Sequence, residues 1–392
     1  MANSNLTQAK TAKNDEFYTQ YSDIEKEMSA YLEYDENVFR GKTILLPCDD
    51  PEWSNFTKYF AQNFERFGLK KLISTSYAAD SKNVIGDYQP TLFELNNPQY
   101  DETKTRVKGK IFSITSDTSG DGKIDVNDLQ WSYLEGDGDF RSNEIKKLRD
   151  EADIIITNPP FSLFREFLAW IIEADKKFAI IGNMNAITYK EVFPLIKENK
   201  MWTGVRFNKR ESGKNMTFYV PDEYELKGTE VEFSEDGRKM ISVAGTGWYT
   251  NLDHGRRHQP LSLMTMEENI KYSKHKEVKG KEYQKYDNYD AIEVPFTDAI
   301  PSDYDGVMGV PISFLDKYCP EQFEIVALGV GEGNFTPTKK YQKFRDPETK
   351  KLITDKRDFL LYVKDPNGKY LTADDYILTK VYARVLIRKI DK

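Results

Sequence analysis

Residues 152–161 read ADIIITNPPF, and this stretch decides the fold class. Its β-branched run, 154–157, predicts a short buried strand, and a tetrapeptide with two prolines ends that strand. Residues 162–174 then repeat apolar side chains at helical spacing. A strand followed at once by a helix is typical of β-α-β units, whose strands are parallel. We therefore expect an α/β domain in which the tetrapeptide lies at the carboxyl end of a strand.

The same alternation continues on both sides of this stretch. A further helix is expected after Ser22, which could cap it while Glu25 closes a capping box. Residues 216–220 and 243–250 alternate like antiparallel edge strands. The order predicts a doubly wound α/β domain. Its expected strands are 42–47, 70–75, 152–157 and 178–182, and its expected helices are 54–67, 162–174 and 189–199.

The length of 392 residues suits two domains. Residues 1–253 carry the α/β pattern, with an irregular insertion at 101–135. Residues 254–392 have a different texture, with one basic stretch at 254–285 and a second at 339–356. We expect this second part to be a region appended to the α/β domain.

Composition excludes several classes of protein. Charged residues make up 31% and aromatic residues 13% of the chain, which is typical of a globular protein rather than a disordered one. Cys48 and Cys319 cannot form a disulfide framework or a zinc site alone, and they fit a reducing cytoplasm. The chain contains no stretch of about 18 apolar residues, which is the pattern that predicts a membrane span. A net charge of -8 argues against bulk coating of nucleic acid, although a local basic footprint could still bind it.

The tetrapeptide Asn158, Pro159, Pro160 and Phe161 supplies hydrogen-bond acceptors and a flat apolar face. In open α/β sheets, ligands bind at the carboxyl ends of strands. The Asn158 Oδ1 and the Pro159 carbonyl could accept both hydrogens of an exocyclic amino group, which favours a pyramidal, reactive nitrogen. Fixed dipoles then stabilise the positive charge that develops on that nitrogen, while Phe161 stacks on the ring. The alternative is a rigid turn without chemistry.

The tetrapeptide resembles the Asp/Asn/Ser-Pro-Pro-aromatic motif of amino-group DNA methyltransferases. The resemblance implies a Rossmann-like class I methyltransferase domain, S-adenosylmethionine as methyl donor, and a flipped adenine in double-stranded DNA as acceptor. It also implies that 254–392 is the DNA target-recognition region of a monomer, and it allows a cognate restriction endonuclease as partner. The flanking text is similar to the EcoRI-type adenine-specific methyltransferase family at 15–20, 48–51, 136–142, 158–166, 180–183, 186–189, 248–252 and 310–318.

The resemblance places the cofactor across the ends of the first strands, next to Asn158. The loop at 46–53 contains no glycine, unlike the loop of most such enzymes, but the family's own version is similar. Its polar residues are candidates for the methionine ammonium or the ribose, with helix capping near Ser54 as the alternative. Asp139 and Phe140 are candidates for the adenine end, with capping near Ser142 as the alternative. The residues assigned to the cofactor by resemblance are Phe17, Tyr18, Thr19, Cys48, Asp49, Asp50, Asp139, Phe140 and Asn158.

Basic residues after the α/β pattern are candidates for contact with DNA phosphates. We expect Arg256, Arg257, Lys274 and Lys276 to make these contacts. The alternative is a solvated surface, which is what most lysine-rich runs are.

Residues 117–128 have the oxygen spacing of an EF-hand-like calcium loop. This spacing predicts a structural calcium site, with an acidic hairpin ordered by Asx-turns at Asp117 and Asp121 as the alternative. Against calcium, the twelfth residue is Asp rather than the usual Glu, and the preceding segment reads as a strand. The expected ligands are Asp117, Ser119, Asp121, Lys123, Asp125 and Asp128.

Two other functions share these features. A protein glutamine methyltransferase would act on a planar amide, whose nitrogen must be made reactive in the same way as the amino group of adenine. A DNA-binding relic could keep the fold without catalysis. Because the flanking text resembles the adenine-specific family, we expect site-specific methylation of adenine in DNA.

Overall fold

The computed structural model describes residues 18–49, 54–78, 98–207, 215–220, 231–234, 236–329, 336, 338–339, 344–345, 352–353, 360–362, 371–373 and 376–390. The chain divides into two compact units. Unit 1 consists of Met1–Ala186 and Met201–Gly255, and unit 2 of Ile187–Lys200 and Arg256–Lys392.

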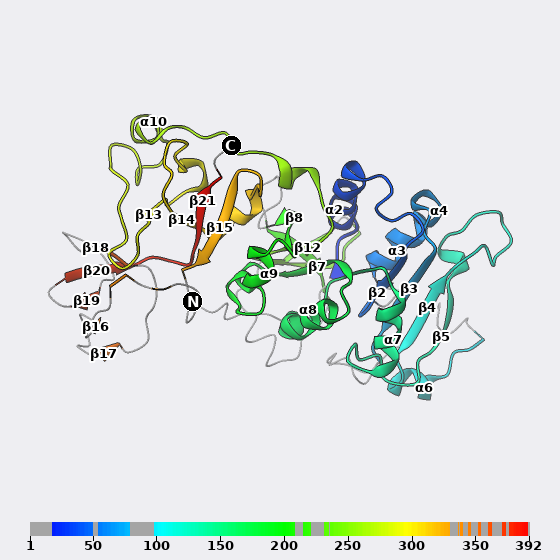
Figure 1. The fold of residues 1–392 in the computed structure, drawn as a ribbon. Coiled ribbons are helices and arrows are strands. Elements are labelled where there is room, and N and C mark those ends of the chain that lie inside the picture. The colour runs from blue at the N-terminus through cyan, green and yellow to red at the C-terminus, as the bar shows by residue number, and fades with distance from the viewer. Residues whose placement is uncertain are drawn as a thin grey trace. The chain divides into compact units, whose positions relative to one another are not determined.

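Unit 1 is built on an eight-stranded mixed sheet with the order β5-β4-β3-β2-β6-β7-β12-β8 (Figure 1). The four central strands, β3, β2, β6 and β7, are parallel, and β4, β5 and β12 run antiparallel to their neighbours. A mixed α/β architecture is therefore confirmed. The strands are β2 (Thr43–Leu46), β3 (Lys71–Ser76), β4 (Lys110–Ile114), β5 (Gln130–Tyr133), β6 (Ile154–Thr157), β7 (Lys177–Asn183), β8 (Trp202–Phe207) and β12 (Thr246–Thr250).

Helices cover both faces of this sheet, with α2, α3 and α4 on one side and α7 and α8 on the other (Figure 1). Because side chains alternate along a strand, Ile44 and Leu46 pack with α2 and α3 in one core cluster, while Leu45 points to the opposite face and is equally buried. The helices of unit 1 are α2 (Tyr21–Tyr34), α3 (Asn55–Gln62), α4 (Phe64–Phe67), α6 (Glu102–Val107), α7 (Asn143–Glu151) and α8 (Phe164–Glu173), with 3-10 turns η2 (Val126–Asp128), η3 (Phe161–Leu163) and η4 (Met184–Thr188).

Several expected boundaries are wrong. Helix α2 begins at Tyr21, after Gln20, so Ser22 is not its cap. The expected helix 54–67 is interrupted at Asn63 and ends at Gly68, whose φ of +63° stops it. Strand β12 is antiparallel as expected, but it is buried between β7 and β8 rather than at an edge. The insertion at 101–135 contributes β4 and β5, so it extends the central sheet.

A second sheet of unit 1 has the order β1-β9-β11-β10 and is antiparallel. Its strands are β1 (Tyr18–Thr19), β9 (Met216–Tyr219), β10 (Val231–Phe233) and β11 (Lys239–Val243). Strand β1 pairs Thr19 with Phe218, which ties the start of the described chain to β9.

Unit 2 contains a four-stranded sheet, β13-β14-β21-β15, and an antiparallel five-stranded sheet, β17-β16-β19-β20-β18. Glu293 on β13 accepts from Arg384 on β21 at 2.5 Å and from the Tyr286 hydroxyl, which fastens the first sheet internally. The strands are β13 (Ile292–Glu293), β14 (Met308–Pro311), β15 (Phe323–Leu328), β16 (Phe344–Arg345), β17 (Leu352–Ile353), β18 (Leu360–Tyr362), β19 (Leu371–Ala373), β20 (Tyr376–Lys380) and β21 (Arg384–Lys389).

The helices of unit 2 are short. The expected helix 189–199 is reduced to α9, and it belongs to this unit. In the described part of the chain, no helix is both long and apolar enough to cross a membrane. The helical elements are α9 (Phe193–Lys197), α10 (Met266–Tyr272), η5 (Gly255–His258), η6 (Thr297–Ala299) and η7 (Ile312–Lys317).

Candidate active site

The tetrapeptide follows β6 directly, and β6 lies beside β2 in the parallel part of the sheet. Thr157, the last residue of β6, is fully buried. Its hydroxyl lies 2.6 Å from the Pro47 carbonyl and 2.6 Å from the Asp49 carboxylate, both in the loop after β2. The structure therefore brings the expected catalytic loop and the expected cofactor loop together.

Asp49 is buried, and its hydrogen bonds connect neighbouring segments of this region. Its carboxylate accepts from the hydroxyls of Thr157 and Ser54, the latter at 2.7 Å. Its amide donates to the Thr75 carbonyl at 2.9 Å, and its carbonyl accepts from Ser74. The N-cap of α3 is Ser54, whose side chain accepts from Phe56. Asp49 thus links the ends of three parallel strands to the start of α3.

Cys48 takes an unusual backbone conformation at this joint. Its φ of +70° lies in the left-handed region, which costs a residue with a side chain of the order of 1–2 kcal/mol. A glycine would adopt such an angle without strain. Its thiol lies 3.9 Å from the Tyr77 hydroxyl, which follows β3.

The loop at 136–141 lies against the end of β3. Ala78 donates to the Asp137 carbonyl at 2.8 Å. Gly138 has a φ of +88°, and a Cβ there would come within 2.3 Å of the Ser76 carbonyl oxygen. Only glycine allows this close approach, which brings Asp139 to the same sheet edge as Cys48 and Asn158.

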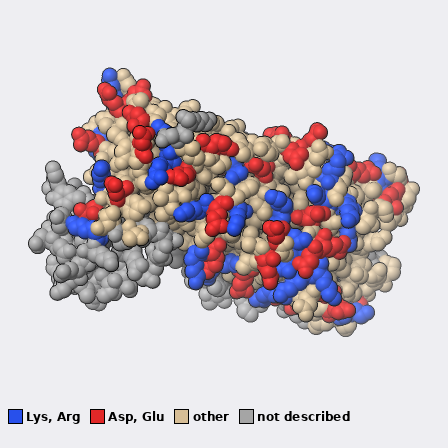
Figure 2. Space-filling model, in the orientation of Figure 1, with Lys and Arg blue, Asp and Glu red and all other residues tan. Residues whose placement is uncertain are grey.

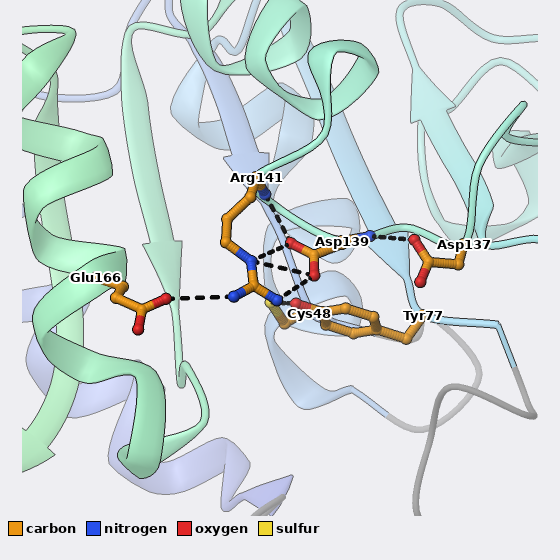
Figure 3. A network of polar contacts seen from close by, with 6 residues as sticks. All are labelled: Cys48, Tyr77, Asp137, Asp139, Arg141 and Glu166. Atoms are coloured by element: carbon orange, nitrogen blue, oxygen red, sulfur yellow. Dashed lines mark hydrogen bonds and ion pairs between the residues drawn. The ribbon is translucent and has the colours of Figure 1, made fainter.

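Asp139 is held by an arginine two residues along the chain (Figure 3). Arg141 donates through Nε to Oδ1 at 2.9 Å and through Nη2 to Oδ2 at 2.5 Å, and its amide donates to Oδ1 at 2.8 Å. These bonds from Arg141 hold the pKa of Asp139 below its ordinary value. The carboxylate is therefore ionised and fixed in orientation, and the alternative that it caps α7 is wrong because Ser142 is that cap.

Phe140 lies in the core rather than at the sheet edge. Its ring is 1% exposed and packs 5.1 Å from Phe167 and 5.7 Å from Trp170, both on α8. The expectation that Phe140 packs against an adenine ring therefore needs correction: the ring anchors the loop that carries Asp139.

Phe161 lies at the start of η3 and is half-buried. Its ring centroid is 6.4 Å from that of Phe218 on β9, and Phe218 pairs with Thr19. The Thr19 carbonyl accepts from Asn55 on α3 at 2.8 Å. Tyr18 and Thr19 thus belong to the strand pair that contacts the tetrapeptide, whereas Phe17 and Asp50 lie outside the described residues.

The expected DNA contacts in unit 2 are mostly engaged within the protein. Arg256 binds Asp316 at 2.6 Å, Arg257 binds Asn199 at 2.9 Å, and Lys274 pairs with Asp298 at 2.8 Å. Lys276 is exposed. Acidic and basic side chains are interspersed over the face that Figure 2 shows. The geometry therefore favours Lys276 among the expected phosphate contacts.

The acidic loop at 117–128 is ordered by its own amides. Asp117 accepts from the amides of Gly120 and Gly122, and Asp121 accepts from Lys123. Amides of Asp125 and Ser119 donate to Asp128 and hold its pKa at about 2. In the described residues, which include this whole loop, no three His, Cys, Asp or Glu side chains form a group that could hold a metal ion. The structure thus supports a hairpin with an Asx-turn at Asp121, whereas Asp117 accepts from amides three and five residues further on. The expected calcium site finds no support.

The profile of the family described as adenine-specific methyltransferase EcoRI matches residues 5–389 of this chain. The chain belongs to this family. Among its relatives is the type II methyltransferase M.EcoRI of Escherichia coli, 45% identical over 344 residues, which are 87% of this chain and 94% of that protein. Two others are M.MgeORF184P of Mycoplasma genitalium and M.MpnI of Mycoplasma pneumoniae, each 35% identical over 323 residues, 82% of this chain and 85% and 84% of theirs. No solved structure matches the chain.

Membership of the EcoRI family confirms the expected enzyme, an adenine-specific DNA methyltransferase. Neither the glutamine methyltransferase nor the non-catalytic relic finds support in these matches.

Three residues of this site escaped the sequence interpretation. Thr157 joins the two loops, Tyr77 lies between Cys48 and Asp139, and Arg141 binds Asp139. Burial, and then the charges of Cys48 and Asp139, raise the pKa of Tyr77 above its ordinary value. Position alone could have indicated Tyr77, because it directly follows the second parallel strand.

Proposed function

We propose that this family member transfers the methyl group of S-adenosylmethionine to the exocyclic amino group of an adenine extruded from duplex DNA. The observation that carries the proposal is the pair of 2.6 Å contacts of the Thr157 hydroxyl, which shares its one hydrogen between the Pro47 carbonyl and the Asp49 carboxylate. They fix the tetrapeptide beside the loop after β2, at the carboxyl ends of parallel strands. Ligands of open α/β sheets bind at this edge.

The strand order supports a doubly wound, Rossmann-like class I methyltransferase domain. From β2 the sheet grows outward to β3 on one side and to β6 and β7 on the other, so the order reverses between β2 and β6. Such a reversal is the topological switch point at which these folds bind their ligands. On the outer side of β7, the sheet continues with β12, which is antiparallel to β7, and then with β8.

The residues at this edge fit S-adenosylmethionine. Asp139 offers an ionised acceptor for the 6-amino group of its adenine, and the Cys48 turn offers backbone close to the sheet edge. Tyr18 and Thr19 lie on the strand that we assign to the methionine end. When bound, the cofactor supplies an electrophilic methyl group on a sulfonium.

The tetrapeptide supplies the other half of the reaction. Asn158 Oδ1 and the Pro159 carbonyl accept the two hydrogens of the target amino group, which directs its lone pair toward the methyl group. These fixed dipoles stabilise the positive charge that grows on the nitrogen, and the proton leaves after transfer. Phe161 stacks on the extruded base, and Pro160 keeps the loop rigid.

Unit 2 is proposed as the DNA target-recognition region and unit 1 as the methyltransferase domain. The boundary between them lies close to the expected one between 1–253 and 254–392, but residues 187–200 belong to unit 2. Relatives named as type II methyltransferases support a role in restriction-modification beside a cognate endonuclease. We propose that the protein acts as a monomer.

Transfer of a labelled methyl group tests this function. Purified protein, labelled S-adenosylmethionine and mixed-sequence duplex DNA should give label only in N6-methyladenine after digestion to nucleosides. A parallel reaction with a glutamine-rich protein acceptor should remain unlabelled. Label in cytosine or in protein, or none in DNA under conditions where the cofactor binds, contradicts the proposal.

A further inference from the structure

Arg141 uses its side chain on both oxygens of one carboxylate. Nε and Nη2 reach Oδ1 and Oδ2 of Asp139 at 2.9 and 2.5 Å, a bidentate geometry that fixes both groups in one plane. With the Arg141 amide also donating, three of the roughly four acceptor positions of this carboxylate are used. About one direction is left for a further donor.

The same guanidinium reaches a second element. Its Nη1 lies 3.3 Å from Oε2 of Glu166, on α8, the helix that follows the tetrapeptide and η3 (Figure 3). All these residues belong to unit 1. Glu166 thus holds Arg141 from the side opposite to Asp139. Glu166 belongs to the segment that also carries Asn158 and Phe161.

We propose that Arg141 is a positioning residue for the cofactor, which holds the Asp139 carboxylate in the orientation that accepts the adenine amino group of S-adenosylmethionine. This inference rests on the proposed function, and it adds a residue that contacts neither the methyl group nor the target base. The held carboxylate discriminates for an amino group, because an oxygen at that position would face another acceptor and could not donate a hydrogen to it.

The guanidinium is essential to this role because of its shape. Asp139 needs two parallel donors, and Glu166 a third that points elsewhere, and a planar fork provides them together. Lysine keeps the positive charge but concentrates it on one rotating ammonium. If charge alone mattered, Arg141→Lys would preserve cofactor binding, and if orientation matters it would not.

Cofactor affinity of the full-length protein tests the proposal. Arg141→Gln and Arg141→Lys should each raise the Kd for S-adenosylmethionine by about 10-fold or more, because the Asp139 carboxylate is no longer held in place and its charged hydrogen bond to the adenine amino group is lost. Turnover at saturating cofactor and the Tm should stay close to those of the wild type. Arg106→Gln is the matched control, since Arg106 also pairs with a carboxylate on the surface of unit 1, at 4.0 Å from Glu102.

A second readout separates positioning from general damage. The wild type should bind S-adenosylmethionine at least about 10-fold more tightly than the analogue with oxygen in place of the 6-amino group, and both Arg141 variants should lose most of this preference. Unchanged affinity in both variants, an equal loss in Arg106→Gln, or weaker affinity with an undiminished preference overturns the proposal. If Arg141→Gln does not fold, Arg141→Lys decides. Failure of the proposed function itself shows in the wild type, which would not bind S-adenosylmethionine at all.

Discussion

Neighbouring residues at the end of β6 have separate roles. Thr157 is buried and bonds inward to Pro47 and Asp49, whereas Asn158 and Phe161 begin the segment that leaves the sheet. The Thr157 hydroxyl fixes the end of the strand inside the protein. This fixed end determines the position of Asn158, the next residue. A threonine is suited to this place because its methyl group fills a β-strand position while its hydroxyl binds the next loop.

Phe161 should contribute to the DNA complex in addition to packing against Phe218. Phe161→Ala should weaken binding to target DNA by about 1–3 kcal/mol because the stacking surface is lost, and Phe161→Trp should be tolerated better. A fluorescent base analogue at the target position, titrated with each variant, measures this. Tyr34→Ala, at an exposed aromatic on α2, is the control. Equal affinities of Phe161→Ala and wild type, or no brightening of the analogue with any target, would contradict the stacking role.

Local chemistry made the tetrapeptide predictable from sequence. Two prolines after a β-branched run have few structural outcomes, so Asn158 to Phe161 could be placed correctly at the end of a strand. Asp49 and Phe140 could not be placed, because their environments come from distant segments: Asp49 from Thr157, and Phe140 from Phe167 and Trp170. The burial of Asp49 and Phe140 could therefore not be predicted from the local sequence.

At the scale of elements, a glycine allows the loop between β5 and α7 to lie directly against β3. Gly138 combines a φ of +88° with a Cβ position only 2.3 Å from the Ser76 oxygen. The loop therefore contacts β3 through backbone alone, and Asp139 follows at the next residue. Such close backbone contact leaves no room for a side chain of any size.

Gly138→Ala should therefore displace the cofactor loop. Gly237→Ala is a matched control, because Gly237 has a φ of +80° but nothing within 4 Å of its Cβ position. Both should lose roughly 1 kcal/mol of stability from the left-handed backbone. Gly138→Ala should lose more than Gly237→Ala, because its Cβ meets the Ser76 backbone, and only Gly138→Ala should also lose cofactor affinity. Urea unfolding and cofactor titration measure the two effects. Equal cofactor affinity in the two variants would show that the loop does not carry the adenine end.

Helices and strands near the tetrapeptide followed from periodicity, but their pairing did not. The alternation at 243–250 indicated one antiparallel strand, but the segment contains the end of β11, a turn and β12, and it could not show that β12 lies between β7 and β8. Pairing partners are far apart in sequence, so no local pattern encodes them. The same limit explains why only the first strand of the insertion at 101–135 was expected from sequence, and why neither β4 nor β5 was assigned to the central sheet.

At the scale of the whole molecule, the ion pair between Arg256 and Asp316 contributes to the stability of unit 2. Burial raises the pKa of its partner Asp316 to about 6, although Arg256 acts to lower it. A carboxyl with a raised pKa contributes stability that is fully present below its unfolded pKa and is lost as pH rises through about 6. Arg256 limits this loss by pairing with the ionised form.

Removing Arg256 should make stability depend more steeply on pH. In Arg256→Ala the pKa of Asp316 should rise further, so the loss of Tm relative to wild type should be larger at about pH 8 than at about pH 5. Thermal unfolding at both values measures it. Arg388→Gln, which breaks an exposed pair with Glu324, should show little dependence on pH. An equal Tm loss at both pH values in Arg256→Ala would mean that Asp316 is not the cause.

Lys276 should contact DNA phosphates more than its neighbours do. Lys276→Ala should reduce the salt slope of DNA binding by about one unit without changing the preferred sequence, and Lys274→Ala should reduce it less because Asp298 already pairs with Lys274. Binding measured across a range of salt concentrations tests this, with the exposed Lys26→Ala on α2 as control. Identical slopes for Lys276→Ala and wild type would return this stretch to a solvated surface.

The central claim is that Asn158, held at the end of β6 beside the cofactor loop, directs methyl transfer to adenine. Methylation-sensitive sequencing of DNA from cells that express either wild type or Asn158→Ala tests it most directly. At equal protein levels, wild type should place N6-methyladenine at one recurrent sequence. Asn158→Ala should leave that sequence unmethylated, since losing one fixed acceptor costs about 100-fold or more in turnover. The same pattern of methyladenine in both strains, or methylation confined to cytosine in the wild type, would contradict the account.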